Sequence, residues 1–254
     1  MTNSVPEFED TDCFLITGSN TTEAHPLIAT RVMRAQKRGA KVIVVDPRDI
    51  QIAKLADIHL QQRPGTDVAW LNGMMHVIIE EGLYDREFVA DRTEGFEELK
   101  AAVSGCTPEW VQRIAGIPAE DLEAAARIYA TAERSAILYA MGITQHTPGV
   151  DHVLSCANLS MLTGNVGKPG TGVNPLRGQN NVQGACDLGG LPNVYSGYQA
   201  VTIESVQAKF KEAWGHAPPT RVGLTVTEMI EAAHHGDLKA LFVLGENPMV
   251  SDPD

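Results

Sequence analysis

The sequence predicts an α/β fold, a Rossmann-like doubly wound parallel sheet with helices on both faces, followed by part of a second α/β domain. Short continuous apolar runs indicate buried parallel strands at residues 13–17, 41–45 and 135–142. Segments with helical spacing of apolar residues separate these runs. Alternation of this kind is typical of βαβ units, whose strands are parallel.

The first βαβ unit spans residues 13–45. Between its two strands, residues 25–39 have the apolar spacing of a helix. Pro26 suits the first turn of that helix, and Gly39 lies just past its basic end, as helix polarity favours.

A short strand at 57–61 and a PGTD turn come next. In that turn Thr66 or Asp67 can cap a helix over residues 69–82. Residues 85–133 read as short helices broken by glycine and proline, of which 120–133 has the strongest pattern.

After the strand at 135–142, residues 149–164 form an amphipathic helix pattern. The tract that follows, 164–190, contains too much glycine and proline for helix or strand, yet it carries few charges and many amides. We therefore expect a ligand-lined or buried loop there instead of a flexible linker.

The last part of the chain predicts helices around 204–214 and 225–235 and a final strand at 240–245. This strand has no return crossover after it, so the second α/β unit is expected to be incomplete. We predict two domains, residues 1–182 and residues 183–254.

The composition describes an acidic chain that can bury a substantial core. Its 254 residues are 43% hydrophobic and carry a formal net charge of −12. This charge argues against nucleic acid and anionic membranes as partners, because their phosphates repel it. No apolar run approaches the roughly 20 residues of a membrane-spanning helix, and the acidic start is unlike a signal peptide. A cytoplasmic location is expected.

Three predicted strands end alike, with apolar residues, then glycine, then a polar side chain: FLITGSN, LYAMGITQ and FVLGENP. The carboxyl ends of parallel strands lie along one edge of a sheet, where α/β proteins bind ligands. Glycine admits a ligand close to the backbone, and Asn20, Gln145 and Asn247 offer amides to it. The pattern indicates a cleft for a nucleotide-like cofactor, with ordinary strand-to-loop exits as the alternative.

Asp46 ends the second predicted strand, and Arg48 follows closely. A carboxylate there could accept hydrogen bonds from a ribose or from the N–H edge of guanine, while the guanidinium meets a phosphate. A solvated turn fits the spacing equally well. The chain has neither GxGxxG after a strand nor GxxxxGK(S/T), so an ordinary NAD site and a P-loop are not supported.

No metal-ligand set is predicted. The four cysteines lie far apart and form no CxxC pair, which favours free thiols. His146 and His152 flank a Pro-Gly turn, and His234 and His235 close a helix, but ordinary histidines are favoured over ligand pairs in both places.

Arg177 is the sole cation between Lys168 and Lys209 and stands within the glycine- and amide-rich tract. A fixed guanidinium in a polar, partly desolvated loop is suited to gripping a carboxylate through two parallel hydrogen bonds. The alternative is a structural arginine bonded to main-chain carbonyls.

The segment MGITQHTPGVDHVLSCANLSMLTGNVGKPGTGVNPLRGQNNVQGACDLG resembles the signature region of the formate dehydrogenase catalytic subunit, in the DMSO reductase superfamily. TNSVPEFEDTDCFLITGSNTTEAHP, AKVIVVDPR and LFVLGENP are similar to further blocks of that subunit in the same order. The resemblance therefore covers essentially the whole chain. Nitrate reductases of the superfamily share the MGITQHT-like and LTG elements but not VNPLRGQNNVQGACD.

The resemblance implies a role for individual residues. Arg177 matches the arginine that holds formate beside the metal, and Gln179 matches a residue lining the pterin. The remaining matches are to cofactor contacts. The positions that contact one guanine dinucleotide arm are Gly18, Asn20, Glu23, Asp46, Arg48, Gly65 and Asp67. Gly142 and Gln145 match a contact at a strand end, and Gly245, Glu246 and Asn247 match contacts in the domain that holds the other arm.

The resemblance also implies oxidation of formate to carbon dioxide at a molybdenum or tungsten bis-molybdopterin guanine dinucleotide (bis-MGD) centre. Electrons would leave through iron–sulfur clusters to electron-transfer subunits that carry iron–sulfur, flavin or NAD. The family's four-cysteine 4Fe-4S module, its metal-ligating cysteine or selenocysteine followed by histidine, and its C-terminal domain have no counterpart in these residues.

The chain is therefore expected to be an internal fragment of the α subunit that is inactive alone. A twin-arginine signal upstream would make the enzyme periplasmic instead of cytoplasmic. Two alternatives stay open, namely a noncatalytic guanine-nucleotide-binding or assembly module with an α/β fold, and a nitrate reductase-type molybdopterin oxidoreductase.

Overall fold

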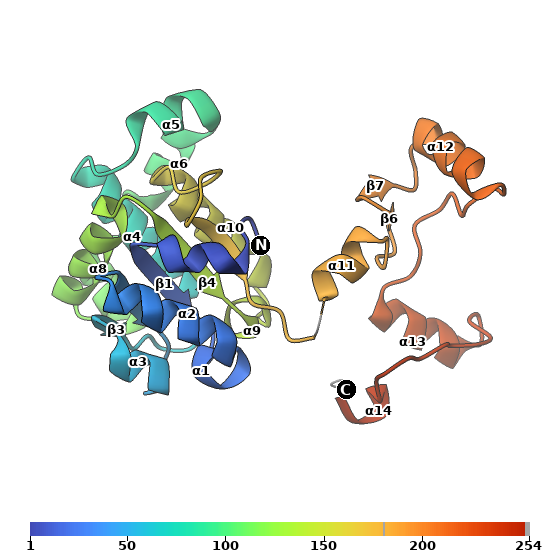
Figure 1. Ribbon diagram of the computed structural model, residues 1–254, viewed down its shortest axis with the longest axis horizontal. Coiled ribbons are helices and arrows are strands. Elements are labelled where there is room, and N and C mark those ends of the chain that lie inside the picture. The colour runs from blue at the N-terminus through green and yellow to red at the C-terminus, as the bar shows by residue number, and fades with distance from the viewer. Residues whose placement is uncertain (180, 252–254) are drawn as a thin grey trace. The chain divides into compact units, whose positions relative to one another are not determined.

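The computed structural model describes residues 1–179 and 181–251. The chain divides into two compact units, Met1–Gly178 and Gln179–Asp254 (Figure 1). No helix among the described residues is long and apolar enough to cross a membrane.

A five-stranded, wholly parallel sheet forms the centre of the first unit (Figure 1). The strands lie in the order β3-β2-β1-β4-β5, with the bounds β1 Cys13–Thr17, β2 Lys41–Val45, β3 Ile58–Leu60, β4 Ser135–Tyr139 and β5 Gly172–Pro175. From β1 the chain winds outward to β3, and it then returns to the other side of β1 to form β4 and β5. This order confirms the doubly wound α/β fold, and sheets of this kind bind ligands where the order reverses, here between β1 and β4.

The register brings the carboxyl ends of the strands level with one another. Thr17, the last residue of β1, pairs with Val45 of β2 and with Tyr139 of β4. Val45 in turn pairs with Leu60, and Tyr139 pairs with Pro175. The residues that directly follow these five strands therefore share one edge of the sheet.

Helices cover both faces of the sheet. One face carries the 3-10 helix η1 (Val5–Asp10), α2 (Pro26–Lys37) and α3 (Gln51–Leu55), after the short α1 (Thr21–Ala24). The other face carries α4 (Asp67–Glu80), α5 (Arg86–Arg92), α6 (Phe96–Val103), α7 (Pro108–Ala115), α8 (Ala119–Thr131) and α10 (Gly149–Leu162), and the short α9 (Met141–Thr144) follows β4.

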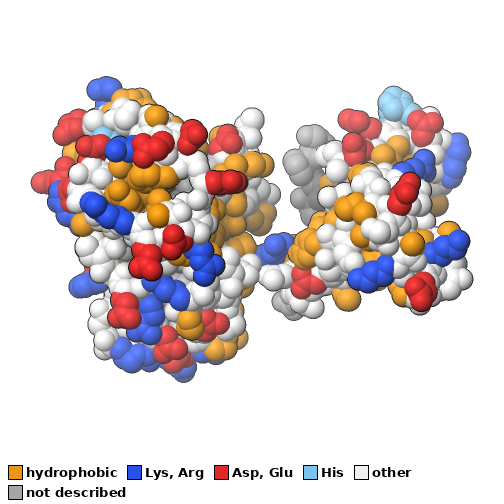
Figure 2. Space-filling view, turned by 90° about the horizontal axis from the view of Figure 1, so that it is seen from above, with side chains coloured by type: hydrophobic (Ala, Val, Ile, Leu, Met, Phe, Trp, Pro, Cys, Tyr) orange, Lys and Arg blue, Asp and Glu red, His pale blue; other side chains and the backbone are white. Residues whose placement is uncertain are grey.

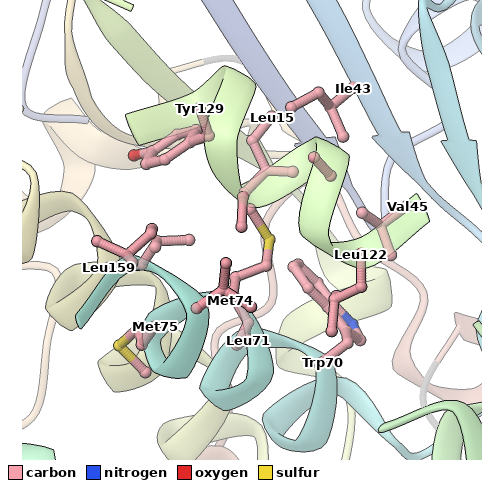
Figure 3. Close-up of a cluster of buried hydrophobic side chains, with 14 of the residues drawn as sticks. Leu15, Ile43, Val45, Trp70, Leu71, Met74, Met75, Leu122, Tyr129 and Leu159 are labelled. Carbon is pink, nitrogen blue, oxygen red and sulfur yellow. The ribbon is translucent and has the colours of Figure 1, made fainter. Parts of the chain in front are cut away.

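Alternating side chains of the strands fill two hydrophobic cores. In β1, Leu15 points to the α4 side, whereas Phe14 and Ile16 belong to the core under α2 and α3. Figure 3 shows Trp70 and Met74 of α4 packed close to the sheet within the larger core. Both side chains are fully buried. Strands buried on both faces explain why their sequences are continuous apolar runs instead of alternating ones.

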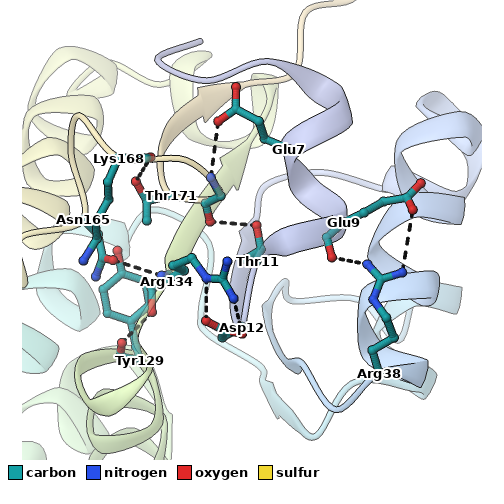
Figure 4. A network of polar contacts seen from close by, with 12 residues as sticks. Glu7, Glu9, Thr11, Asp12, Arg38, Tyr129, Arg134, Asn165, Lys168 and Thr171 are labelled. Carbon is teal, nitrogen blue, oxygen red and sulfur yellow. Dashed lines mark hydrogen bonds and ion pairs between the residues drawn. The ribbon is translucent and has the colours of Figure 1, made fainter.

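A polar network ties η1 to the loop before β5 (Figure 4). The Glu7 carboxylate accepts hydrogen bonds from Asn3 Nδ2 at 2.8 Å and from the Gly170 amide at 3.3 Å. Thr11 Oγ1 donates to the Gly170 carbonyl at 2.8 Å. These bonds fix the chain that leads into β5.

The expectation that residues 164–190 form neither helix nor strand was wrong in two places. Gly172–Pro175 forms β5, and Val182–Asp187 forms the helix α11. β5 lies at the sheet edge and pairs only with β4, so a proline and a glycine are tolerated there. Pairing with a neighbouring strand overrides the weak local propensity of GVNP.

The second unit contains short helices and one small antiparallel ladder. Its elements are α11, β6 (Val194–Tyr195), β7 (Gln199–Ala200), α12 (Glu204–Trp214), α13 (Val226–His235) and α14 (Pro248–Ser251). Tyr195, Val201 and Phe210 form its buried cluster, and the Trp214 ring packs at 4.8 Å from that of Phe210. The two predicted helices of this part are confirmed as α12 and α13.

The predicted strand at 240–245 is not formed. Residues 240–245 are irregular, and the side chains of Phe242 and Leu244 are 91% and 84% exposed. A strand exists only when its backbone pairs with another. Within the described part of this unit, β6 and β7 pair with each other and not with this segment.

Candidate functional site

A cavity of about 250 Å³ lies at the carboxyl edge of the sheet, where the strand order reverses. Its lining comes from the ends of β1, β2, β3 and β4 and from the start of α4. The lining residues are Gly18, Asp46, Pro47, Arg48, Gln62, Pro64, Gly65, Asp67, Gly142 and His146. The fold therefore brings Gly18, Asp46, Arg48, Gly65, Asp67 and Gly142 of the predicted cofactor contacts together.

Two glycines form a main-chain contact in this cavity. The Gly142 amide donates to the Gly18 carbonyl at 3.0 Å. A Cβ atom added to Gly142 would lie 2.6 Å from Gly18 Cα, and one added to Gly18 would lie 2.6 Å from the carbonyl carbon of Gly142. Gly18 also has φ +57°, a conformation that favours glycine. Glycine is therefore required here for the approach of β1 to β4, besides any approach of a ligand.

Asp46 and Arg48 form one wall. Asp46 is buried, and its Oδ1 accepts a hydrogen bond from the Arg48 main-chain amide at 2.9 Å. The same oxygen forms an ion pair with Arg48 Nε at 3.4 Å. His59 Nε2 donates to the Asp46 main-chain carbonyl at 2.9 Å, which fixes the strand end. Because the Arg48 side chain is largely exposed, its guanidinium stays available to an anion.

A second wall of the cavity is formed by Gln62 and Asp67, which follow β3. Asp67 Oδ1 accepts from Trp70 Nε1 at 3.3 Å and from Gln62 Nε2 at 3.4 Å. Gln62 Oε1 is buried and has no hydrogen-bond partner among the described residues. A buried acceptor that lines a cavity needs a donor, which a bound ligand or a water molecule can supply. Sequence reasoning missed Gln62, although its place between the predicted strand at 57–61 and the PGTD turn could have identified it.

Arg177 lies two residues beyond β5, on the same edge of the sheet. Its side chain is exposed, and among the described residues it has no ion pair and no side-chain hydrogen bond. Burial raises the pKa of the Tyr139 hydroxyl at the end of β4, and the Arg177 guanidinium opposes that shift. The guanidinium therefore lies within electrostatic reach of the strand end next to the cavity, and it is not tied to a structural partner in the described chain.

The remaining predicted contacts do not line this cavity. Asn20 is the N-cap of α1, where its Oδ1 accepts from Thr22 Oγ1, and Glu23 is an exposed residue of the same helix. Gln145 is exposed at the end of α9. The others belong to the second unit: Gln179, Gly245, Glu246 and Asn247.

A larger hollow, of about 560 Å³, lies between α5 and α6, and Figure 2 views the face where acidic side chains rim hydrophobic ones. Tyr84, Val89 and Phe96 supply its apolar part, and Glu94, Glu97 and Glu98 supply acidic groups. None of the predicted site residues lines it. We therefore place the candidate site at the strand ends.

The cavity at the strand ends combines hydrogen-bond acceptors with one cation. Asp46, Gln62 and Asp67 present oxygen acceptors, which match a base with several N–H donors, as guanine has on its N1 and N2 edge. Arg48 supplies a positive charge for a phosphate. The residues present fit a guanine nucleotide group, which the unpartnered Gln62 oxygen supports independently of any family resemblance.

The comparisons with known proteins identify relatives of this chain. The α subunit of F420-dependent formate dehydrogenase 1 from Methanococcus maripaludis is 54% identical over 254 residues, and formate dehydrogenase H from Escherichia coli is 48% identical over 255 residues. Both matches cover 100% of this chain, which spans 37% and 36% of the two relatives.

Among solved structures, acetylene hydratase from Pelobacter acetylenicus matches with a TM-score of 0.58 and 37% identity, over 62% of this chain and 22% of that one. The molybdopterin oxidoreductase family model matches residues 1–254. Together, the doubly wound sheet, the acceptor-lined cleft and this full-length match show that the chain belongs to the molybdopterin oxidoreductase family.

Proposed function

We propose that this chain is the part of a formate dehydrogenase α subunit that binds formate and one arm of the cofactor. The observation that carries the proposal is Arg177, a guanidinium without a structural partner in the described chain, directly beyond the strand that borders the cofactor edge. The formate dehydrogenase relatives at 48–54% identity support it. The reaction of the whole enzyme is the two-electron oxidation of formate to carbon dioxide.

Arg177 binds the formate carboxylate in this proposal. A planar guanidinium donates two parallel hydrogen bonds to the two oxygens of a carboxylate, which fixes the direction of the C–H bond. Such a grip contributes orientation and charge complementarity, and it needs no proton transfer by the arginine. Gln179, two residues further, lines the pterin part of the cofactor.

The cavity at the strand ends holds one guanine dinucleotide arm. Asp46, Gln62 and Asp67 accept the N–H groups of the base, and Arg48 faces the phosphates. Gly18, Gly65 and Gly142 leave room for the ligand along the main chain, and Asn20, Glu23 and Gln145 contact it from the short helices α1 and α9 and their ends. When bound, the molybdenum or tungsten bis-MGD centre supplies the acceptor for the two electrons of formate.

The second unit contributes to the other dinucleotide arm through Gly245, Glu246 and Asn247 in this proposal, with residues 183–254 as part of a separate cofactor-binding domain. The partners are formate, the rest of the α subunit and electron-transfer subunits with iron–sulfur clusters, flavin or NAD. A cytoplasmic enzyme is proposed.

The test replaces Arg177 by lysine in the full-length subunit. One ammonium group cannot reproduce the planar fork, so kcat/KM for formate should fall roughly 10- to 100-fold, as expected for loss of a charge-assisted bidentate contact. Metal and pterin content should stay near the wild-type level. Arg221→Lys, an equally exposed arginine of the second unit, is the matched control and should leave kcat/KM unchanged.

An Arg177→Lys enzyme with unchanged kcat and KM would refute the role of Arg177. The isolated 254-residue chain distinguishes a noncatalytic module from the proposed function. It should bind GDP weakly in calorimetry and show no formate-dependent dye reduction. If the full-length subunit binds GDP or cofactor and yet oxidises no formate, the noncatalytic binding module replaces the proposal.

A further inference from the structure

Asp67, His146 and His152 bring potential metal-ligand atoms together beside the cavity. One such atom from each residue lies within 4.8 Å of the other two. Asp67 and His146 line the cavity, and His152 is buried. The chain folds these three residues together from separate elements, since Asp67 begins α4 whereas His146 and His152 flank the start of α10.

Each of the two imidazole rings is fixed by a hydrogen bond to a main-chain carbonyl. His152 Nδ1 lies 2.8 Å from the Ile143 carbonyl, and His146 Nε2 lies 2.9 Å from the Gly142 carbonyl. Since a carbonyl only accepts, each of these nitrogens carries a hydrogen, and in the neutral tautomer the other nitrogen of the ring has a lone pair. Metal-binding histidines are fixed in this way by a main-chain carbonyl on the far nitrogen.

The third group is also anchored. Two N–H donors, Trp70 Nε1 and Gln62 Nε2, hold the Asp67 carboxylate from one side at 3.3 Å and 3.4 Å. A buried carboxylate and two imidazole lone pairs are all acceptors, so they cannot satisfy one another. Only a cation or a multiple donor meets all three.

We propose that Asp67, His146 and His152 form a site for a divalent transition metal of the Zn²⁺ class. Two imidazole nitrogens and one carboxylate oxygen are a usual protein donor set for such ions. Ligand atoms around one tetrahedral zinc ion lie about 3.3 Å apart, so the three atoms must close by about 1.5 Å at most. His146 lies in the turn after α9 and is only partly buried, so it can make this adjustment.

Three protein ligands leave a fourth position for water. Because Asp67 and His146 line the cavity, that position is reached from the cavity. In the proposed function, Asp67 also accepts a hydrogen bond from the guanine base. Competition between a metal ion and a guanine nucleotide for Asp67 therefore rests on that function. A metal and a guanine nucleotide that share Asp67 exclude one another.

The experiment measures Zn²⁺ binding to the 254-residue chain by calorimetry, and Co²⁺ absorption spectra report the ligand type. The background variant carries His234→Asn, His235→Asn and Cys186→Ser, which removes an exposed histidine pair and the half-buried thiol. It should bind one Zn²⁺ ion. Adding His146→Asn should weaken the affinity at least about tenfold, because a ligand is lost.

His146→Asn is the decisive variant because the residue is only partly buried, and thermal melting shows whether it is folded. Asp67→Asn should weaken binding to the same degree. His76→Asn is the matched control and should leave the affinity for Zn²⁺ unchanged. His76 lies on α4, where its Nδ1 contacts the Val103 carbonyl. Absence of Zn²⁺ binding, or equal affinity in the folded His146→Asn chain, overturns the site.

GDP separates this inference from the proposed function. If the two share Asp67, saturating GDP should weaken Zn²⁺ binding at least about tenfold by competition. Zn²⁺ affinity that is unchanged in saturating GDP overturns the shared ligand. A chain that binds Zn²⁺ through His146 but does not bind GDP refutes the guanine cleft and leaves the metal site supported.

Discussion

The imidazole Nε2 of His25 lies 2.8 Å from the main-chain carbonyl oxygen of Arg177. His25 stands between α1 and α2, in the loop that follows β1, and Arg177 follows β5. The bond therefore joins two strand ends that are separated in the sheet by β4. The other ring nitrogen, Nδ1, is buried without a partner, so a single hydrogen bond determines the position of this ring in the described chain.

We predict that His25→Ala loosens Arg177 in the full-length enzyme. Loss of one hydrogen bond, about 0.5–1.5 kcal/mol, should raise KM for formate about two- to tenfold while kcat and metal content change little. His25→Asn should recover part of the loss, because its amide also donates. A fall in kcat and metal content together, with KM unchanged, would indicate a general structural defect instead of a positioning role.

The unpartnered oxygen of Gln62 gives a prediction for nucleotide binding. Gln62→Met keeps the length of the side chain but removes the buried acceptor, so the affinity of the 254-residue chain for GDP should fall about fivefold, the effect of about 1 kcal/mol. Gln61→Met is the matched control, since Gln61 is exposed and outside the cavity lining. Calorimetry that gives equal GDP affinities for all three chains would exclude Gln62 as a base contact.

The contact between Gly18 and Gly142 predicts a local cost of any added side chain. Gly142→Ala places a Cβ 2.6–2.9 Å from main-chain atoms of Gly18, which cannot move independently of β1. The free energy of unfolding should fall by about 1–3 kcal/mol in denaturant titrations. Gly105→Ala meets no atom within 4 Å and should change it by less than about 1 kcal/mol. Equal stabilities of the two variants would contradict the main-chain contact.

Glu7 makes the stability of the first unit depend on pH. Hydrogen bonds from the Ser4 and Asn3 side chains lower the pKa of the Glu7 carboxyl from 4.5 to about 2. A lowered pKa stabilises the folded state above the unfolded value, and this contribution disappears as pH falls from 4.5 to about 2. Unfolding titrations between pH 7 and pH 2 should show this loss of folding stability for the wild-type chain and a smaller loss of stability for Glu7→Gln. Parallel pH profiles of the two chains would assign the acid sensitivity to other groups.

Much of the fold could be predicted because local pattern and burial agree. β1, β2 and β4 are continuous apolar runs, and each lies in the buried centre of the sheet. β5 could not be predicted, since GVNP has no apolar run and becomes a strand only by pairing with β4. For residues 240–245 the opposite holds. Their apolar run predicts a strand, but no strand forms because the segment has no paired neighbour among the described residues.

The candidate site was predictable in part for a related reason. Asp46 directly follows β2 and Gly142 lies three residues past β4, so strand prediction alone puts them near the ligand edge. The unpartnered oxygen of Gln62 and the closeness of Asp67 to His146 both depend on how side chains pack in the folded chain, which the local sequence does not show. His25 was missed because its bond to Arg177 crosses 152 positions of sequence.

The floor of the cavity is peptide where Gly18 meets Gly142. Peptide groups have no rotamers, so this part of the cavity cannot reshape itself around different occupants. In the proposed guanine site, discrimination between guanine and other bases therefore comes from the walls. Exchanging the wall residues Asp46, Gln62 and Asp67 would then retune the nucleotide preference of this sheet edge.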